Sequence, residues 1–185
     1  MTKPITYIAD QARVLAATAV TANDDRKHDL TSGVREFNVM LEHAGDTGQK
    51  VIVIGNGGSA AIALHMAEDL IKTRGVRALA PLGGPLLTCI GNDLGFERVF
   101  STSVGIFADP GDVLVAISSS GESVNIVLAA KEAKERACAV VTFTGRNCGN
   151  HLRKLGDLNF YVPSQSYGQV ENAHATLIHC VLDCV

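Results

Sequence analysis

The sequence predicts an α/β fold in which a parallel β-sheet is covered by helices on both faces. The first observation is that the strand-like segments after residue 50 are apolar at nearly every position, which is typical of strands buried on both faces. The second is that these segments alternate with stretches of helical periodicity, the order that produces parallel strands joined by helical crossovers. Because the sequence has no internal repeat and no low-complexity segment, we expect a single domain over residues 1–185.

The first 48 or so residues are predicted to form two helices and no strand. Apolar residues recur at helical spacing between Ile5 and Ala16. A second helical pattern runs over about 30–43, and the glycine-containing stretch 45–48 closes it. This segment therefore precedes an α/β core of residues 49–185.

From residue 50 onward, short apolar runs alternate with helical stretches. Strands are expected at 51–54, within 76–82, and at 113–117, 139–144 and 158–162. Helices are expected at 59–72, 86–92 and 123–136, near residue 150, and at 169–184. A chain of 185 residues is long enough to bury a sizeable core in one domain.

Composition excludes several classes of protein. The formal net charge is −3, so no basic surface suggests nucleic acid as a partner. No apolar run approaches the roughly 20 residues that span a membrane, and the start of the chain lacks the apolar core of a signal peptide. The five cysteines form no Cys-x-x-Cys pair. We therefore expect a cytoplasmic protein with reduced, mostly buried thiols and no membrane partner.

Residues 51–59, Val-Ile-Val-Ile-Gly-Asn-Gly-Gly-Ser, join a buried strand to a helix through a glycine-rich turn. The first turn of a helix carries unpaired N–H groups and a partial positive charge, so this junction favours a bound anion. Gly55, Gly57 and Gly58 allow the backbone to approach a ligand. Ser59 can cap the helix or donate a hydrogen bond. The turn predicts a site for a phosphorylated small molecule.

A second turn of this kind follows the strand at 113–117. Residues 118–123 read Ser-Ser-Ser-Gly-Glu-Ser and offer four hydroxyl groups just before a helix. In an open parallel sheet, ligands bind beyond the carboxyl ends of the strands where the strand order reverses, so both turns can face one phosphate. Serine and glycine also form ordinary loops. Two such turns, each directly after a buried strand, favour the binding site.

Acidic and histidine side chains on two helices form the candidate catalytic group. His65 and Asp69 are four residues apart and share a helix face, although such a pair is also common on solvated surfaces. On the last helix, Glu171 and His179 are eight residues apart, about 80° around the axis, and can border one site. The alternative for His174 or His179 is a structural role. His179 lies in an apolar run and is expected to be buried.

The two turns resemble a known family. Residues 55–59 and 117–123 resemble the two signatures of sugar isomerase (SIS) domains, and 91–96, Gly-Asn-Asp-Leu-Gly-Phe, resembles a segment of the phosphoheptose isomerase branch. The resemblance implies a flavodoxin-like sheet of about five parallel strands behind two N-terminal helices. It also implies a homotetramer with shared active sites, in which residues 1–48 serve in oligomerisation. The implied reaction converts sedoheptulose 7-phosphate to D-glycero-D-manno-heptose 7-phosphate through an enediolate, for lipopolysaccharide or other glycan precursors.

The resemblance also implies the role of each site residue. The phosphate is expected at Asn56, Gly57, Gly58, Ser59, Ser118, Ser120 and Ser123. The sugar is expected near Asn92, Asp93, Ser119 and Glu171. Asp69 is the expected base, with Glu68 as its substitute, and His179 is the expected acid. Zinc is the expected cofactor, held by His65, Asp69, Glu171 and His179.

Two of these positions depart from the family pattern. Asp69 stands where a glutamate is expected and is one methylene shorter, and Glu171 stands where a glutamine is expected. Both keep an oxygen that can bind a metal. The glycine-rich stretch 83–85 leaves open a different sugar phosphate as substrate. A further alternative is a non-catalytic SIS module that binds a protein such as the replication initiator DnaA, a branch that lacks the histidine matched by His179.

Overall fold

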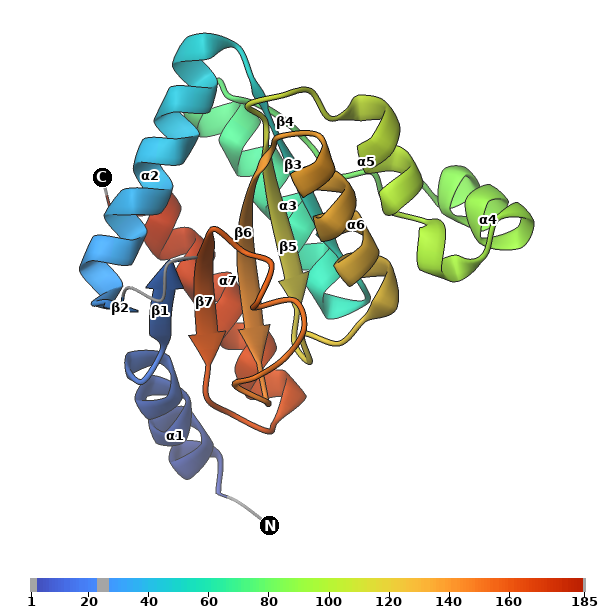
Figure 1. The fold of residues 1–185 in the computed structure, drawn as a ribbon. Helices are drawn as coiled ribbons and strands as arrows, with labels where there is room; N and C mark the ends of the chain where they lie inside the picture. The colour runs from blue at the N-terminus through green and yellow to red at the C-terminus, as the bar shows by residue number, and fades with distance from the viewer. Residues whose placement is uncertain (1–2, 23–26, 185) are drawn as a thin grey trace.

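A computed structural model describes residues 3–22 and 27–184, and within these ranges it forms one seven-stranded sheet between two layers of helices (Figure 1). The strands are β1 (Ala19–Ala22), β2 (Lys27–His28), β3 (Lys50–Gly55), β4 (Arg77–Leu79), β5 (Val113–Ser118), β6 (Ala139–Gly145) and β7 (Leu158–Val162). The helices are α1 (Pro4–Ala16), α2 (Leu30–Thr47), α3 (Gly58–Arg74), α4 (Gly84–Asp93), α5 (Ser101–Phe107), α6 (Val124–Glu135) and α7 (Tyr167–Asp183), with a 3₁₀ turn at Phe96–Arg98. None of the helices in the described ranges has the length and apolar character needed to cross a bilayer.

The strand order is β2-β1-β7-β6-β5-β3-β4. Strands β3 to β7 pair in parallel. Numbered among themselves, these five strands follow the order 2-1-3-4-5, which is that of flavodoxin-like folds. The direction of winding reverses between β3 and β5, so the carboxyl ends of these two strands flank the switch point. The expected flavodoxin-like arrangement of five parallel strands is confirmed.

The sheet is two strands wider than the sequence predicts. β1 pairs antiparallel with β7, placing Val20 opposite Phe160, and β2 pairs antiparallel with β1. Val20 and Ala22 are buried beneath α2, and a Cβ at Gly33 would lie only 2.5 Å from Val20 Cγ1. The expectation of no strand before residue 48 is therefore wrong. A four-residue strand has too short an alternation to stand out beside the helical patterns that flank it.

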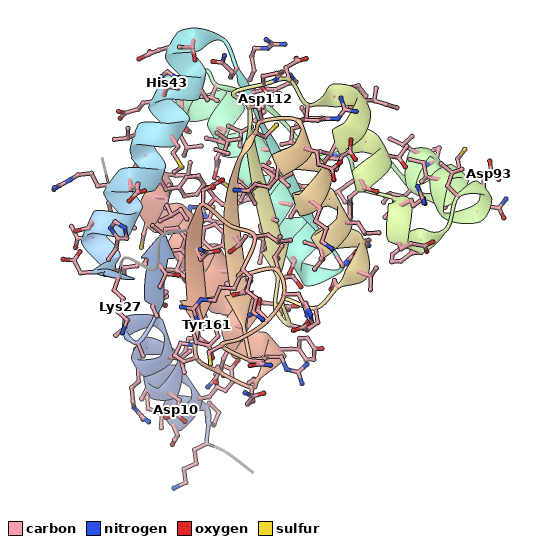
Figure 2. The ribbon with its side chains drawn as sticks, in the orientation of Figure 1. Asp10, Lys27, His43, Asp93, Asp112 and Tyr161 are labelled. Atoms are coloured by element: carbon pink, nitrogen blue, oxygen red, sulfur yellow. The ribbon has the colours of Figure 1, made fainter. Side chains whose placement is uncertain are left out.

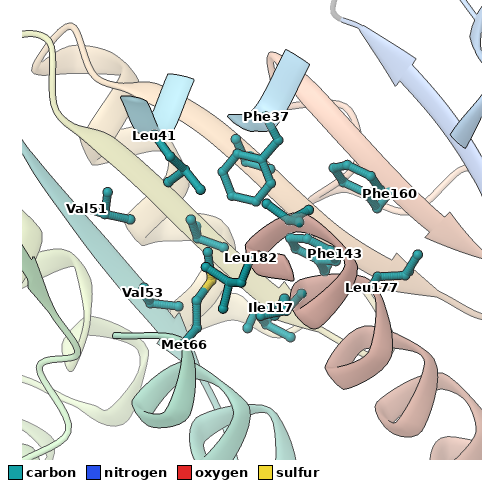
Figure 3. Close-up of a cluster of buried hydrophobic side chains, with 14 of the residues drawn as sticks. Phe37, Leu41, Val51, Val53, Met66, Ile117, Phe143, Phe160, Leu177 and Leu182 are labelled. Carbon is teal, nitrogen blue, oxygen red and sulfur yellow. The ribbon is translucent and has the colours of Figure 1, made fainter. Parts of the chain in front are cut away.

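The helices divide between the two faces of the sheet. α2, α3 and α7 pack on one face, while α5 and α6 pack on the other and α4 projects beyond them (Figure 1). On the first face the rings of Phe143 and Phe160 stack at 4.8 Å, and Phe37 from α2 is tilted against both (Figure 3). Met66 from α3 and Leu177 from α7 belong to the same buried cluster. α3 and α7 therefore lie in contact along one line, called here the α3–α7 seam.

A partly buried ion-pair cluster, in which Asp109 is exposed, holds the amino ends of the strands together. Lys50 Nζ lies 2.6 Å from a carboxylate oxygen of both Asp109 and Asp112. Asp112 is 1% exposed and accepts further hydrogen bonds from the backbone N–H groups of Lys50 and Asp109. The hydrogen bond from Lys50 lowers the pKa of Asp109. Figure 2 shows Asp112 at the end of the sheet opposite the carboxyl ends of the parallel strands.

The structure also differs from the sequence-based expectations in two helical segments and in the burial of the cysteines. Helix α5 is not anticipated by the sequence, and the region near residue 150 forms turns instead of the expected helix. All five cysteines lie in the described ranges as free thiols, and only Cys138 is buried. Cys180 is half-buried, and the three others are exposed, so the expectation of mostly buried thiols is wrong.

Candidate active site

Glycines shape the turn between β3 and α3. A Cβ at Gly55 would lie 2.5 Å from the carbonyl oxygen of Ser59, and Gly57 has a φ of 53°, which L side chains rarely adopt. Gly58 faces α7, where a Cβ would lie 2.7 Å from a carboxylate oxygen of Glu171. No side chain among the described residues caps the start of α3. The N–H of Ala60 donates to the carbonyl of Gly57 at 3.0 Å, which leaves the N–H groups of Gly58 and Ser59 for an anion.

Hydroxyl groups hold the turn between β5 and α6. Ser118 Oγ accepts a hydrogen bond from a backbone N–H of the turn at 3.1 Å and contacts Ser123 Oγ at 3.3 Å. Ser120 Oγ accepts from the backbone N–H two residues on, at 3.1 Å. Ser119 is 6% exposed, and its Oγ has no hydrogen-bond partner among the described residues. An unpaired buried hydroxyl is costly, so Ser119 is a donor available to a ligand.

The two turns meet in a cavity of about 110 Å³ at the carboxyl ends of β3 and β5. This volume is well below the roughly 300–1,000 Å³ of pockets for drug-sized ligands, so the cavity suits one small group. It lies at the switch point of the sheet, where folds of this class bind ligands. Its described lining residues include no lysine or arginine: they are Asn56, Ser59, Ile117, Ser118, Ser119, Ser120, Ser123, Tyr167 and Glu171.

A second polar group lies farther along the α3–α7 seam. His65 Nε2 is 3.3 Å from Asp69 Oδ2, and with His179 these residues place three ligand atoms within 4.8 Å of one another. The two imidazole rings meet edge to face at 5.2 Å. The histidines border a cleft of about 240 Å³ whose other walls are apolar, formed by Ala61, Ile62, Ala175 and Ile178. Two imidazole nitrogens and one carboxylate oxygen form a donor set that suits zinc.

Comparison with known proteins agrees with this geometry. The sequence profile described as the SIS domain matches residues 16–145, well over half of the chain. The chain belongs to the SIS domain family. Phosphoheptose isomerases from Geobacter metallireducens and Geobacter sulfurreducens are 40% and 38% identical over 165 residues, which cover 86% of this chain and 87% of each relative. The solved structure of phosphoheptose isomerase GmhA from Neisseria gonorrhoeae matches with a TM-score of 0.83 at 32% identity, covering 97% of this chain and 95% of that one. Within the family, the chain falls in the phosphoheptose isomerase branch.

The two histidines on the last helix of this SIS domain lie in different environments, and only that of His179 departs from the expectation. The side chain of His179 is 45% exposed, because it faces the outer surface of the α3–α7 seam, so the expected burial is wrong. His174 is fully buried, with Nε2 3.2 Å from the carbonyl oxygen of Thr144. Its Nδ1 has no hydrogen-bond partner among the described residues. Burial lowers the pKa of His174 to about 4, so the ring is neutral and joins α7 to β6.

Two acidic candidates of the SIS domain lie outside the three-residue cluster. Glu171 is eight residues before His179, about 12 Å along a helix axis, and its carboxylate lies against Gly58 at the 110 Å³ cavity. The side chain of Glu68 is 65% exposed, with Oε2 at 4.0 Å from Nδ1 of His65. Glu68 therefore lies on the solvent side of His65, while Glu171 belongs to the phosphate end of the seam.

The expected sugar-contacting pair lies away from both groups. Asn92 and Asp93 end α4, where Asn92 Nδ2 donates to Asp93 Oδ1 at 2.7 Å. Figure 2 shows Asp93 on the projecting helix, far from the sheet edge that carries the two turns. Within one chain, the structure does not bring this pair to the cavity.

Sequence reasoning missed two residues of the site. The side-chain amides of Asn56 and Asn125 exchange hydrogen bonds at 2.9 and 3.0 Å and join the two turns. Asn125 is 3% exposed, and a polar residue in the otherwise apolar start of α6 was a usable signal. Tyr167 lines the cavity from the start of α7. No spacing pattern distinguishes Tyr167 as a cavity residue, because an aromatic residue at the start of a helix can equally well lie on the protein surface.

Proposed function

We propose that this chain is a phosphoheptose isomerase that interconverts sedoheptulose 7-phosphate and D-glycero-D-manno-heptose 7-phosphate. The observation that carries the proposal is the pairing, along one α3–α7 seam, of a small hydroxyl-lined cavity with the cluster of His65, Asp69 and His179. The Geobacter relatives that bear this enzyme's name support the same assignment at 38% and 40% identity.

The spacing along α3 suits a substrate with a phosphate at one end and a carbonyl at the other. His65 lies six residues after Ser59, about 9 Å along the axis, and Asp69 lies one turn farther. Helical side chains lean toward the N-terminus of their helix, so both lean toward the end of α3 that borders the cavity. A seven-carbon sugar phosphate is long enough to reach from the serines to this cluster.

In this proposal Asp69 is the base and His179 is the acid. The Asp69 carboxylate takes a proton from the terminal carbon beside the ketone and returns it to the former carbonyl carbon. His179 moves a proton from the terminal hydroxyl to the carbonyl oxygen, so that the ketose becomes an aldose. Asp69 is 9% exposed, and its two oxygens face His65 and Lys72 at 3.3 and 3.4 Å. These contacts hold the base in place.

Zinc is the proposed cofactor, because two imidazole nitrogens and a carboxylate oxygen are suited to a zinc site that keeps one position open. His65, Asp69 and His179 would hold it. When bound, the ion supplies Lewis acidity to the substrate carbonyl and stabilises the charge of the enediolate. Glu171, the expected fourth ligand, would have to turn away from Gly58 to join these three residues.

We further propose a cytoplasmic homotetramer in which one domain per chain contributes to shared active sites. Leu64 and Ile71 are 52% and 56% exposed on α3, the helix that carries His65. Ile5 and Ile8 are similarly exposed on α1, at 71% and 63%. Exposed apolar groups next to a catalytic cluster support burial against another subunit, with residues 1–48 taking part. Light scattering on purified protein measures the subunit number directly.

The experiment that tests the function is an isomerase assay on the metal-free and zinc-loaded full chain. Zinc-loaded protein is expected to convert sedoheptulose 7-phosphate to the aldose, followed by NMR of the anomeric protons. Asp69→Asn is the matched control, since it preserves size and removes the basic carboxylate. No turnover by the loaded wild-type protein on any heptose or ketose phosphate would overturn the proposal. A clear preference for a shorter sugar phosphate would keep the chemistry and change the substrate.

A further inference from the structure

The phosphate-sized cavity has an unusual balance of charge. Its described lining offers hydroxyl and amide groups and one carboxylate, Glu171, but no cationic side chain. A phosphate monoester carries a charge of about −1.5 to −2 at neutral pH. Placing this charge beside Glu171 is unfavourable unless a cation lies near, because opposite charges must compensate in a partly desolvated site.

Arg146 is a strained residue that does not itself line the cavity but contacts Tyr167, which does. It directly follows β6 and has a φ of 60°, an uncommon backbone conformation for a residue other than glycine. Its N–H donates to the carbonyl of Ser164 at 3.1 Å. Its carbonyl accepts from Tyr161 Oη at 2.9 Å and from Gln165 Nε2 at 3.1 Å. These three hydrogen bonds hold the backbone of Arg146 in this conformation, which Ala137 also adopts with a φ of 56°.

The preceding residue brings Arg146 next to the serine turn. Gly145 ends β6, and a Cβ there would lie 3.1 Å from the carbonyl oxygen of Ser119. Arg146 therefore follows a residue that packs against Ser119, and Ser119 lines the cavity.

The guanidinium group of Arg146 is held against Tyr167. Its Nη1 donates to the hydroxyl of Tyr167 at 2.8 Å, and its Cζ lies 4.8 Å from the centre of that ring. Tyr167 itself lines the cavity. Arginine suits this position better than lysine, because a planar guanidinium can stack on a ring and still direct N–H groups to an anion.

We propose that Arg146 is the counter-charge of the phosphate pocket and that Tyr167 positions it at the pocket mouth. The inference rests on the proposed function in one respect, namely that the substrate carries a phosphate. Arg146 sets the preference for a dianionic group over a neutral sugar and offsets the carboxylate of Glu171. Tyr167 acts through Arg146, by holding its guanidinium in place.

The sequence supplies a matched control on the same loop. Arg153 stacks on Tyr161 at 4.7 Å and donates to the carbonyl of Cys148 at 3.1 Å. It has the same charge and the same kind of ring contact as Arg146, but Tyr161 does not line the cavity. Arg146→Asn and Arg153→Asn therefore remove the same charge from two places. Asparagine tolerates positive φ, so the first variant keeps the backbone of the turn.

The test measures the dissociation constant of inorganic phosphate by calorimetry, together with KM and kcat for sedoheptulose 7-phosphate. Arg146→Asn is expected to weaken phosphate binding about tenfold to a hundredfold, the scale of one hydrogen bond to a charged group. KM should rise in proportion while kcat changes little. Tyr167→Phe should weaken binding about two- to tenfold. Arg153→Asn should leave it within about twofold, and Arg146→Lys should recover part of the loss.

The outcomes separate this inference from the proposed function. Turnover of the heptose phosphate with an unchanged KM in folded Arg146→Asn would overturn the role of Arg146 and leave the isomerase standing. Phosphate binding that depends on Arg146 in a protein without isomerase activity would support the role of Arg146 and overturn the isomerase function. Equal losses in Arg146→Asn and Arg153→Asn would show a general charge effect and would overturn the inference, as would a wild-type protein that binds neither ligand. If Arg146→Asn does not fold, the same measurements are made on Arg146→Lys and Tyr167→Phe. Wild-type phosphate binding in both variants would overturn the inference.

Discussion

The two ends of the α3–α7 seam are built in different ways. At the phosphate end, glycine turns and strand ends present backbone groups and serines that are nearly inaccessible, such as Ser59 at 2% and Ser118 at 4% exposure. At the other end, side chains on helix surfaces form the cluster, and the imidazoles of His65 and His179 are 53% and 45% exposed. The first end is rigid because the sheet fixes it. The second end is formed by three side chains, and its exposure to water depends on whether another subunit or the substrate covers them.

This difference suggests a division of labour. A buried, preorganised pocket binds the unreactive end of a substrate without further ordering, and that binding energy holds the reactive end in place. The exposed end must lose water before its groups act at full strength, so closure by another subunit or by substrate has the larger effect there. Changes at the histidine end should therefore affect kcat, and changes at the phosphate end should affect KM.

The largest expected effect is at Asp69. Asp69→Asn should lower kcat by about a hundredfold to ten-thousandfold, because general-base catalysis contributes on that scale. KM should change little, since the phosphate end is untouched. Steady-state kinetics checks this, and Asp69→Glu tests whether the shorter side chain limits the rate. An equal loss in Glu68→Gln would instead assign the base to Glu68, which lies 4.0 Å from His65.

A variant at the amino ends of the strands, opposite the two turns, should affect stability alone. Asp112→Ala leaves Lys50 buried with one partner and removes two backbone hydrogen bonds. We expect a loss of about 3–5 kcal/mol in the free energy of unfolding, the usual result of breaking a buried ion pair. Urea unfolding measures it. The kcat of the folded fraction at low temperature should match wild type, and a specific loss of kcat would contradict the separation of the two edges.

His174 lies between the two ends and should make stability depend on pH. Its pKa is lowered to about 4 by burial, so the unfolded chain binds the proton more tightly. Stability is fully present above about pH 6.5 and falls as pH drops toward 4, by at most about 3 kcal/mol. His174→Gln should remove this slope while keeping a donor for Thr144. Unfolding at pH 7.5 and pH 5 compares the two proteins, and equal slopes would exclude His174 as the cause.

The smallest expected effect is at Ser119. Its Oγ has no partner among the described residues, so Ser119→Ala removes no internal hydrogen bond and should leave stability unchanged or slightly raised. Although the family resemblance places Ser119 near the sugar, its hydroxyl lines the small cavity, so the dissociation constant for phosphate should rise about tenfold. Ser120→Ala is the comparison, because Ser120 Oγ already accepts from the backbone of its own turn. A loss confined to Ser120→Ala would contradict this role for Ser119.

The sequence predicted the phosphate end better than the histidine end. Apolar strands followed by the turns at 55–59 and 118–123 mark the switch point, because strand ends in a parallel sheet meet at one edge. The positions of Glu171 and His179 could not be derived in this way. Helical spacing gives an angle around α7, whereas the packing of α7 on α3 decides that Glu171 reaches Gly58 and that His179 is exposed.

The remaining differences arise from contacts that span the chain. β1 was missed because its pattern is only four residues long and its stability depends on β7. Arg146 was missed because no sequence pattern predicts a left-handed backbone conformation at an arginine. Hydrogen bonds with Ser164, Tyr161 and Gln165 hold that conformation. Tertiary hydrogen bonds of this kind have no local pattern to detect.

The pairing of β1 with β7 also sets the order in which the protein is assembled during synthesis. Val20 emerges from the ribosome early, but its partner Phe160 emerges only when nearly all of the sheet has been made. The parallel strands can pair as they are synthesised. The apolar side chains of β1 and of one side of α2 stay exposed until β7 has been synthesised. A nascent chain arrested before residue 158 should therefore be cleaved by protease in its first thirty or so residues and bound there by chaperones, and release of the β7 segment should protect it.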